Sequence, residues 1–291
     1  MIFPPRDLGA RENGLTESLS PEHRRLDEQH LPKTQFEALD FERSALFLDV
    51  DGTLLDEAAT PEGVVAPESL LANLGRLETA LGGAMAIVTG RTLADLDLLF
   101  QHLRIRAAGV HGAQMRFDPA QRAPIEEFPV LPDRLWRALN VRLAEFPGTF
   151  AENKRFSFAV HFRARPDASA RLRSALEPLV AAESAFGLVL AEARLAYEIK
   201  SPGFDKGLAI AKFMSCPPFA GRTPIFIGND ATDDFGFAAV VDRGGLAYSV
   251  GERRPKALAM FPDPGTVRRW LEGLLGVVAT SSKLEEPGAC A

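Results

Sequence analysis

Two aspartates separated by a single residue stand directly after an apolar run near position 49. The run 45–48 leads into Asp49, and Asp51 follows after one spacer. Such a run is typical of a strand buried on both faces, and because side chains alternate along a strand, both carboxylates should leave its end on the same side. Gly52 permits a sharp turn there. Crowded like charges are tolerated mainly where a cation or a reaction needs them, so the spacing predicts a metal-binding or catalytic site.

Two other interpretations of this motif compete with the first. A solvated turn is possible in principle, because Asp and Gly are common loop residues. A calcium loop of the helix-loop-helix type needs Gly at its sixth position, Glu at its twelfth and a helix before it. Counted from Asp49, those positions are Leu54 and Thr60, and a strand-like segment precedes them. The calcium loop is therefore excluded.

Two further apolar runs also end in polar residues. Residues 84–88 lead into Thr89 and Arg91, and residues 223–228 lead into a strongly acidic segment. Ligands of open α/β sheets bind beyond the carboxyl ends of the strands, so the three runs should place their polar ends together. A cluster of acids there suits a hard divalent cation, and Mg²⁺ held by few carboxylates is associated with phosphate chemistry. The acidic segment contributes Asn229, Asp230, Asp233 and Asp234.

The elements that would position these residues alternate between strand and helix. Leucines at helical spacing predict a helix over 67–81, and a second helix is expected over 92–102. The same pattern returns after residue 199, with helices over 205–214 and 266–275 and a strand over 245–250. This alternation predicts an α/β fold with a Rossmann-like parallel sheet.

The middle of the chain has a different pattern. Residues 155–163 alternate strictly between apolar and small or polar side chains, which predicts an antiparallel strand with one buried face. Predicted helices over 134–146 and 167–183 and a hairpin over 187–200 complete a small α+β unit inserted into the α/β one. The expected organisation is an N-terminal arm (1–40), a discontinuous core (41–112 and 199–278), an inserted α+β cap domain (113–198) and a C-terminal tail (279–291).

The bulk composition narrows the class of protein. The 291 residues are 46% hydrophobic and 25% charged, as in ordinary soluble domains, and the net charge of −6 argues against nucleic acid or an anionic membrane as partner. Cys216 and Cys290 are too few for a disulfide framework. No apolar run approaches the roughly 18 residues of a membrane span, and the first residues lack a secretory signal, so a cytoplasmic location is expected. The oligomeric state is left open, a monomer included.

Taken in order, these segments resemble the four motifs of the haloacid-dehalogenase-like (HAD) phosphatases. Additional segments make the chain more closely similar to the trehalose-6-phosphate phosphatase group within that superfamily, over about residues 44–275. The HAD motifs are matched by Leu-Asp49-Val-Asp51-Gly-Thr-Leu, Thr89-Gly-Arg91, Lys206-Gly and Gly-Asn-Asp230-Ala-Thr-Asp233-Asp234. The additional segments are 87–92, 108–113, Glu152-Asn-Lys with His161-Phe-Arg163, and 197–207.

The resemblance implies a reaction and a role for each motif residue. Asp49 would attack phosphorus and form an aspartyl-phosphate, and Asp51 would act as general acid and then as general base. Thr89 and Lys206 would neutralise charge on the transferring group. Asn229 stands where the family usually has an Asp. The Mg²⁺ ligands would come from Asp49, Asp51, Asp230, Asn229, Asp233 and Asp234.

The inserted unit would then close over the site as a cap and bind the sugar. Charged groups bind sugar hydroxyls through directional hydrogen bonds. By resemblance, Glu152, Lys154 and Glu198 would hold the distal glucose and Arg163 would serve the phosphate side. Arg91 and His111 are the remaining expected substrate contacts, the latter at the junction of core and cap.

The function expected from these residues is Mg²⁺-dependent hydrolysis of trehalose 6-phosphate to trehalose and phosphate. Three alternatives stay open at this stage. The first is a phosphatase for another sugar phosphate, such as sucrose 6-phosphate or a glycosylated phosphoglycerate. The second is a sugar phosphomutase, which also uses paired aspartates. The third is a non-catalytic sugar-phosphate sensor, against which Asp51 argues, because binding alone needs no acid/base residue.

Overall fold

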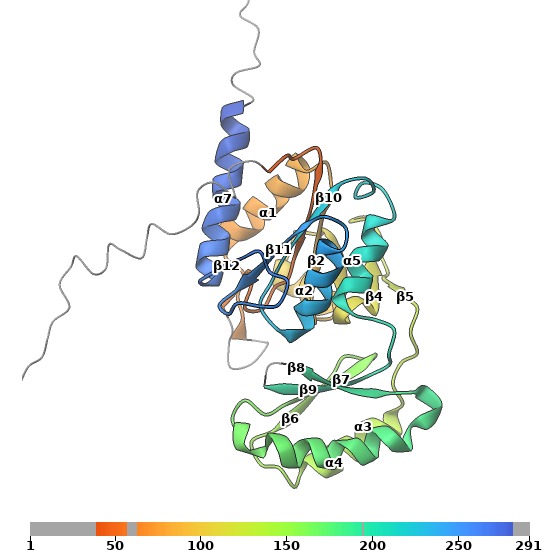
Figure 1. The fold of residues 1–291 in the computed structure, drawn as a ribbon. Helices are drawn as coiled ribbons and strands as arrows, with labels where there is room; N and C mark the ends of the chain where they lie inside the picture. The colour runs from red at the N-terminus through yellow and green to blue at the C-terminus, as the bar shows by residue number, and fades with distance from the viewer. Residues whose placement is uncertain (1–38, 57–62, 194, 282–291) are drawn as a thin grey trace, which may run out of the picture. The chain divides into compact units, whose positions relative to one another are not determined.

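The computed structural model describes residues 39–56, 63–193 and 195–281. The predicted N-terminal arm (1–40) and C-terminal tail (279–291) lie outside these ranges except for two or three residues at their inner ends. The elements of the described part are shown in Figure 1.

A large sheet carries the acidic motifs. Its central strand, β1 (Ser44–Leu48), is completely buried and pairs in parallel with β10 (Thr223–Gly228) on one side and β2 (Met85–Val88) on the other. Five neighbouring pairs are parallel and the last two are antiparallel. The strand order in the described residues is β12 (Ala259–Phe261), β11 (Leu246–Val250), β10, β1, β2, β3 (Arg106–Gly109), β4 (Gln114–Arg116) and β5 (Ile125–Glu126). The parallel α/β core predicted from the sequence is confirmed.

The register of these strands brings their carboxyl ends together. Leu48 of β1 is level with Ile87 of β2 and Ile227 of β10, and the amide of Asp49 donates to the carbonyl of Ile227 at 3.0 Å. The segments that follow the three strands therefore emerge side by side. At Gly52 the backbone φ is +76°, which a glycine adopts without steric cost, so the sharp turn expected after the acidic pair is present.

Helices pack in pairs beside the large sheet. Helix α1 (Glu68–Ala80) buries the leucines that its spacing singled out and packs against α7 (Pro264–Ser281). Helix α5 (Lys206–Met214) packs against α6 (Asp234–Val241), which the sequence did not reveal, and α2 (Leu93–Phe100) packs against β3. In the part of the chain that the structure describes, no helix combines the length and apolar character needed to cross a bilayer.

A second, antiparallel sheet has the order β6 (Phe150–Asn153), β7 (Ser157–His161), β9 (Ala196–Lys200) and β8 (Val189–Ala193). Helices α3 (Asp133–Leu143) and α4 (Ser169–Ala182) lie side by side along it (Figure 1). Phe158, Val160 and Phe162 face these helices in one apolar core. The alternation predicted for this strand is correct, but the opposite face is not solvated: Ser157 is 0% exposed.

The large sheet continues farther along the chain than the sequence suggested. The predicted cap begins at residue 113, whereas β4 and β5 extend the large sheet to Glu126. The two segments that connect the sheets meet in a small apolar cluster, which we call the crossover cluster. Phe128 of the outgoing segment packs edge-on against Phe204 of the returning one, with ring centroids 4.8 Å apart. Val110, Ala113 and Phe156 complete it.

Candidate active site

Asp49 is almost completely buried at the end of β1, and both of its carboxylate oxygens accept hydrogen bonds. Lys206 Nζ donates to Oδ1 at 2.8 Å and Thr53 Oγ1 donates to Oδ2 at 3.0 Å. Burial raises the pKa of Asp49, and the nearby charge of Asp230 adds to that rise, although Lys206 opposes it. The carboxylate is therefore fixed in orientation and surrounded by like charge.

Lys206 supplies the positive charge that offsets these crowded carboxylates. It is the first residue of α5, where Asp205 caps the helix by accepting from the amide of Leu208. Its ammonium group donates to Asp49 and, at 2.7 Å, to Oδ1 of Asp233. Burial alone would lower the pKa of Lys206, but Asp233 and Asp49 outweigh it and raise the pKa above its ordinary value. Lys206 therefore stays charged inside the site.

Asp233 organises the loop after β10. Its Oδ2 accepts from the backbone amides of Asn229, at 2.8 Å, and Asp230, at 3.0 Å, while Oδ1 is bound to Lys206. The side chain of Asp233 has no exposed surface. Its carboxylate therefore holds the loop and the lysine in place, and it does not line the cavity described below.

The other acidic residues of this loop divide between the site and the surface. Asp230 lines the cavity, and its Oδ1 accepts from the amide and the hydroxyl of Thr232 at 2.8 and 2.6 Å. Burial would raise the pKa of Asp230, but Lys206 and Thr232 lower it below its usual value. Asp234 is bound through both oxygens to Arg254 and lies outside the cavity.

Asp51 faces the cavity in a two-point contact with Arg91. Arg91 Nε donates to Asp51 Oδ2 at 2.7 Å and Nη2 donates to Oδ1 at 2.6 Å. Thr89 is nearly inaccessible, and its hydroxyl accepts from the amide of Arg91 at 3.1 Å. The structure thus brings Asp51 and Arg91 to the cavity, whereas Thr89 is buried and does not line it.

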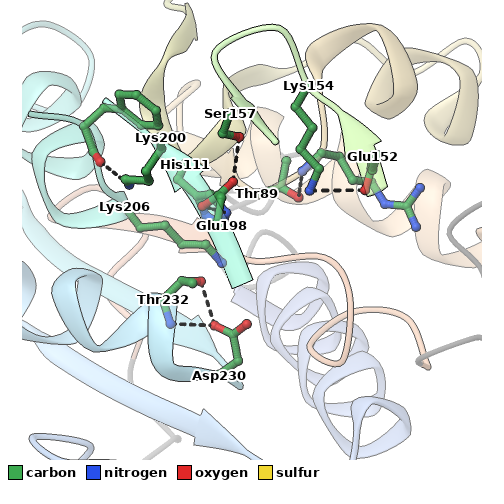
Figure 2. Close-up of polar contacts among 12 residues, drawn as sticks. Thr89, His111, Glu152, Lys154, Ser157, Glu198, Lys200, Lys206, Asp230 and Thr232 are labelled. Atoms are coloured by element: carbon green, nitrogen blue, oxygen red, sulfur yellow. Dashed lines mark hydrogen bonds and ion pairs between the residues drawn. The ribbon is translucent and has the colours of Figure 1, made fainter. Parts of the chain in front are cut away.

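His111 and Glu198 meet where the core approaches the small sheet (Figure 2). The Nε2 atom of His111 lies 3.5 Å from Oε2 of Glu198, and Ser157 Oγ donates to the other carboxylate oxygen at 2.7 Å. Burial lowers the pKa of His111 to about 4, against the opposing effect of Glu198, and the charges of Lys206 and Lys154 lower it further.

His111 has a neutral ring and an unusual backbone conformation. At neutral pH the ring is uncharged, so its proton is assigned to the nitrogen that faces Glu198. Within the described residues Nδ1 is buried without a hydrogen-bond partner. The backbone φ is +54° at His111 and +46° at Val110, a left-handed conformation that is costly for both residue types. A Cβ at Gly90 would lie 2.8 Å from this ring, so glycine is required there.

A second polar group lies on β6 and β7 of the small sheet. Glu152 Oε2 is 3.5 Å from Lys154 Nζ and 3.3 Å from His161 Nε2. Burial would raise the pKa of Glu152, but His161 and Lys154 lower it overall. The ring of Phe150, which is 44% exposed, stacks on His161 with the centroids 4.6 Å apart. Glu152, Lys154 and His161 therefore form a polar group that is flanked by the aromatic ring of Phe150.

One cavity of about 200 Å³ joins these groups. Of the residues predicted from the sequence, only Thr89, Asp233 and Asp234 do not line it. The predicted residues that do are Asp49, Asp51, Arg91, His111, Glu152, Lys154, Arg163, Glu198, Lys206, Asn229 and Asp230. Residues with no predicted role also contribute. Thr53 donates to Asp49, Ser157 donates to Glu198, and Phe150 lines the cavity. Ser157 could have been found from its place on the same strand face as His161.

The donor atoms around Asp49 suit a hard divalent cation. Asp49, Asn229 and Asp230 present carboxylate and amide oxygens to the cavity, which are ligands that Mg²⁺ accepts together with water and phosphate oxygens. In the described ranges, no three His, Cys, Asp or Glu side chains are gathered into a ready-made metal site. The carboxylates nearest the site are bound by cations of the chain: Lys206 binds Asp49 and Asp233, and Arg91 binds Asp51.

Comparisons with known proteins agree with this geometry. The sequence profile of the trehalose-phosphatase family matches residues 47–255. The trehalose-6-phosphate phosphatase of Escherichia coli K12 is 38% identical over 235 residues, which cover 78% of this chain and 85% of that protein.

Solved structures extend the similarity to the fold. The crystal structure of a trehalose-6-phosphate phosphatase related protein has 27% identity and a TM-score of 0.67, over 81% of this chain and 99% of that one. A HAD-superfamily phosphatase from Bacteroides thetaiotaomicron shares the fold at 16% identity and a TM-score of 0.52, over 81% of this chain and 96% of that one.

Proposed function

This chain belongs to the trehalose-phosphatase family and hydrolyses trehalose 6-phosphate to trehalose and phosphate, and we propose that Asp49 is the nucleophile of that reaction. The observation that carries the proposal is the position of its carboxylate, held between Lys206 and Thr53 where the central strand opens into the cavity. The alternatives (another sugar phosphate, a phosphomutase or a sensor) are not favoured by the family match.

In the first half-reaction, an oxygen of Asp49 forms a bond to phosphorus as the bond from phosphorus to the sugar oxygen breaks. Asp51 donates a proton to that leaving oxygen. Lys206 and the hydroxyl of Thr89 offset the negative charge on the transferring group. The products of this step are trehalose and an aspartyl-phosphate at position 49.

In the second half-reaction, Asp51 accepts a proton from a water molecule that attacks the same phosphorus. The bond to Asp49 breaks, and phosphate leaves with the carboxylate restored. Asp49, Asp230 and Asn229 would hold a Mg²⁺ ion, which supplies charge neutralisation at the phosphate when bound. Asp233 would act by fixing Lys206 and the loop rather than as a ligand, and Asp234 is committed to Arg254.

The part of the predicted cap (113–198) that follows β5 would act as a cap that recognises the sugar. Glu152, Lys154 and Glu198 would hold the distal glucose, because they present charged groups to the cavity on one sheet. Arg163 would serve the phosphate side, and His111 would contact the substrate beside Glu198. The core would then comprise residues 41–126 and 199–278, because β4 and β5 belong to the large sheet.

The test of the nucleophile is the release of phosphate from a panel of sugar phosphates, with Mg²⁺ or with a chelator. Asp49→Asn should abolish turnover with the fold intact, whereas Asp56→Asn, seven residues farther at an exposed site, should keep it. Substantial turnover by Asp49→Asn would reject the covalent route. A clear preference for sucrose 6-phosphate or glucose 6-phosphate would reject the substrate.

The test of the cap uses a substrate without a sugar. Glu152→Ala should raise KM for trehalose 6-phosphate strongly and leave p-nitrophenyl phosphate almost unaffected, because the aryl ester has no hydroxyl for Glu152. Glu192→Ala, on exposed β8 of the same sheet, is the matched control. Equal losses on both esters would show that Glu152 has another role.

A further inference from the structure

Arg91 and Asp51 form a paired polar contact in the cavity. Its two hydrogen bonds, of 2.7 and 2.6 Å, join Nε and Nη2 of the guanidinium to the two carboxylate oxygens. Paired contacts of this kind fix the orientation of a carboxylate as well as binding it. The side chain of Arg91 is 12% exposed and that of Asp51 is 39% exposed. Arg91 is thus the less exposed partner, although both side chains line the cavity.

The backbone of Arg91 is anchored on both sides. Its amide donates to the hydroxyl of Thr89 at 3.1 Å, and its carbonyl accepts from the amide of Val110 at 2.8 Å. The packing is so close that a Cβ at Gly109 would lie 2.9 Å from the same carbonyl. Asp51 lies on the turn that Gly52 makes after β1, where it forms an isolated β-bridge with Leu55. Both backbones are thus held in place, and the paired contact sets how the guanidinium and the carboxylate meet.

Asp51 must be placed accurately, because it transfers a proton in both steps of the reaction. It must reach the leaving oxygen in one step and a water molecule in the next, and errors of about 1 Å in such placements can cost two orders of magnitude in rate. Nε and Nη2 of Arg91 both donate to Asp51, so two of the five N–H donors of the guanidinium are directed at a protein carboxylate.

We propose that Arg91 is the positioning residue of Asp51: its paired hydrogen bonds place the carboxylate for both proton transfers, and Arg91 acts on the reaction through Asp51. The proposal rests on the two-step reaction above, in which Asp51 transfers protons. It changes the role expected for Arg91 from the sequence, which was substrate contact.

The test compares an ester that needs its leaving group protonated with one that does not. Arg91→Lys keeps the charge and loses the paired geometry. With trehalose 6-phosphate, kcat should fall on the order of 10²-fold, the lower end of what general acid–base catalysis contributes, with little change in KM. With p-nitrophenyl phosphate, a rapid burst of about one p-nitrophenol per enzyme should remain, because that leaving group departs unprotonated. Slow turnover should follow, because hydrolysis of the aspartyl-phosphate still needs the base.

Arg91→Lys combined with Asp51→Asn separates this role from the others. If Arg91 acts only through Asp51, the double variant should be no slower than Asp51→Asn alone. Losses that multiply in the double variant would overturn the proposal. So would a raised KM and a slowed burst with both esters, which would indicate phosphate binding.

Two further outcomes complete the design. A lower urea midpoint accompanied by equal loss on both esters would assign Arg91 a structural role and overturn the proposal. If the wild-type enzyme prefers a different sugar phosphate, the assigned substrate fails. The same comparison run with that ester still decides the role of Arg91.

Discussion

Removing the ammonium group of Lys206 should destabilise the metal-free protein severely. Lys206 is the buried cation between Asp49 and Asp233, with contacts of 2.8 and 2.7 Å and exposed side-chain fractions of 3%, 6% and 0%. Lys206→Met keeps a side chain of similar length but leaves two buried carboxylates without their shared counter-ion. Loss of one partner from a buried ion pair costs about 3–5 kcal/mol. Because two carboxylates lose their partner together, we expect the upper half of that range.

That cost approaches the lower end of the total stability of native domains, about 5–15 kcal/mol, so the variant should lose a large share of its free energy of unfolding. The measurement is urea unfolding in the presence of a chelator, followed by the fluorescence of Trp136 and Trp270. Lys212→Met, in the same helix, removes an exposed pair with Glu127 and should change the free energy of unfolding by less than about 1 kcal/mol.

Asp49→Asn provides the opposite perturbation. It removes one of the crowded negative charges and leaves the pair of Lys206 with Asp233 intact, so stability should be unchanged or slightly increased while activity is lost. The reasoning would be refuted if Lys206→Met unfolded within about 1 kcal/mol of the wild type, or if Asp49→Asn were equally destabilised.

Three further predictions concern acidity, sugar recognition and the metal. The pKa of His111 is about 4 in the folded protein and about 6.5 in the unfolded chain, so its contribution to stability is complete above pH 6.5 and is lost as the pH falls toward 4. The difference of about 2.5 units amounts to roughly 3 kcal/mol; His111→Asn should therefore lose less stability than the wild type between pH 7 and pH 4.5 in urea titrations. Ser157→Ala should raise KM for trehalose 6-phosphate but not for p-nitrophenyl phosphate, because Glu198 loses its 2.7 Å hydrogen bond; Ser174→Ala on exposed α4 is the control, and equal effects would contradict the assignment. Chelation should abolish turnover and Mg²⁺ should restore it, while activity that persists in excess chelator would exclude the metal site.

The buried strands and their polar ends could be predicted because each carries its own signal. An unbroken apolar run followed by acids or by Thr89 and Arg91 needs no partner to be recognised, and the parallel arrangement follows from the helices between the runs. The alternation over 155–163 similarly identified the strand that carries Ser157 and His161. These signals are local in the sequence.

What the sequence could not predict depends on contacts between distant segments. Asp234 was expected at the metal, but Arg254, twenty residues later, binds both of its oxygens. Asp233 was expected either to bind the metal directly or to hold its ligands, and its carboxylate holds Lys206 and two backbone amides of its own loop. The short strands β4 and β5 have no pronounced pattern and are recognised only by the pairing of β4 with β3 and of β5 with β4. Tertiary packing decides which carboxylate is available to a metal ion and which is bound by an arginine or a lysine of the chain.

The crossover cluster bears on how this protein could be recombined with its relatives. Phe156 lies in the turn between β6 and β7, whereas Phe128 and Phe204 belong to the two connecting segments and Val110 and Ala113 belong to the core. A chimera joined at residues 133 and 200 would import a foreign side chain at position 156 against four native neighbours, and would leave a void or a clash at the joint. Junctions placed before Phe128 and after Phe204 would transfer the three aromatic rings as a matched set. Exchange of sugar specificity between homologues should therefore succeed only when the two linkers travel with the graft.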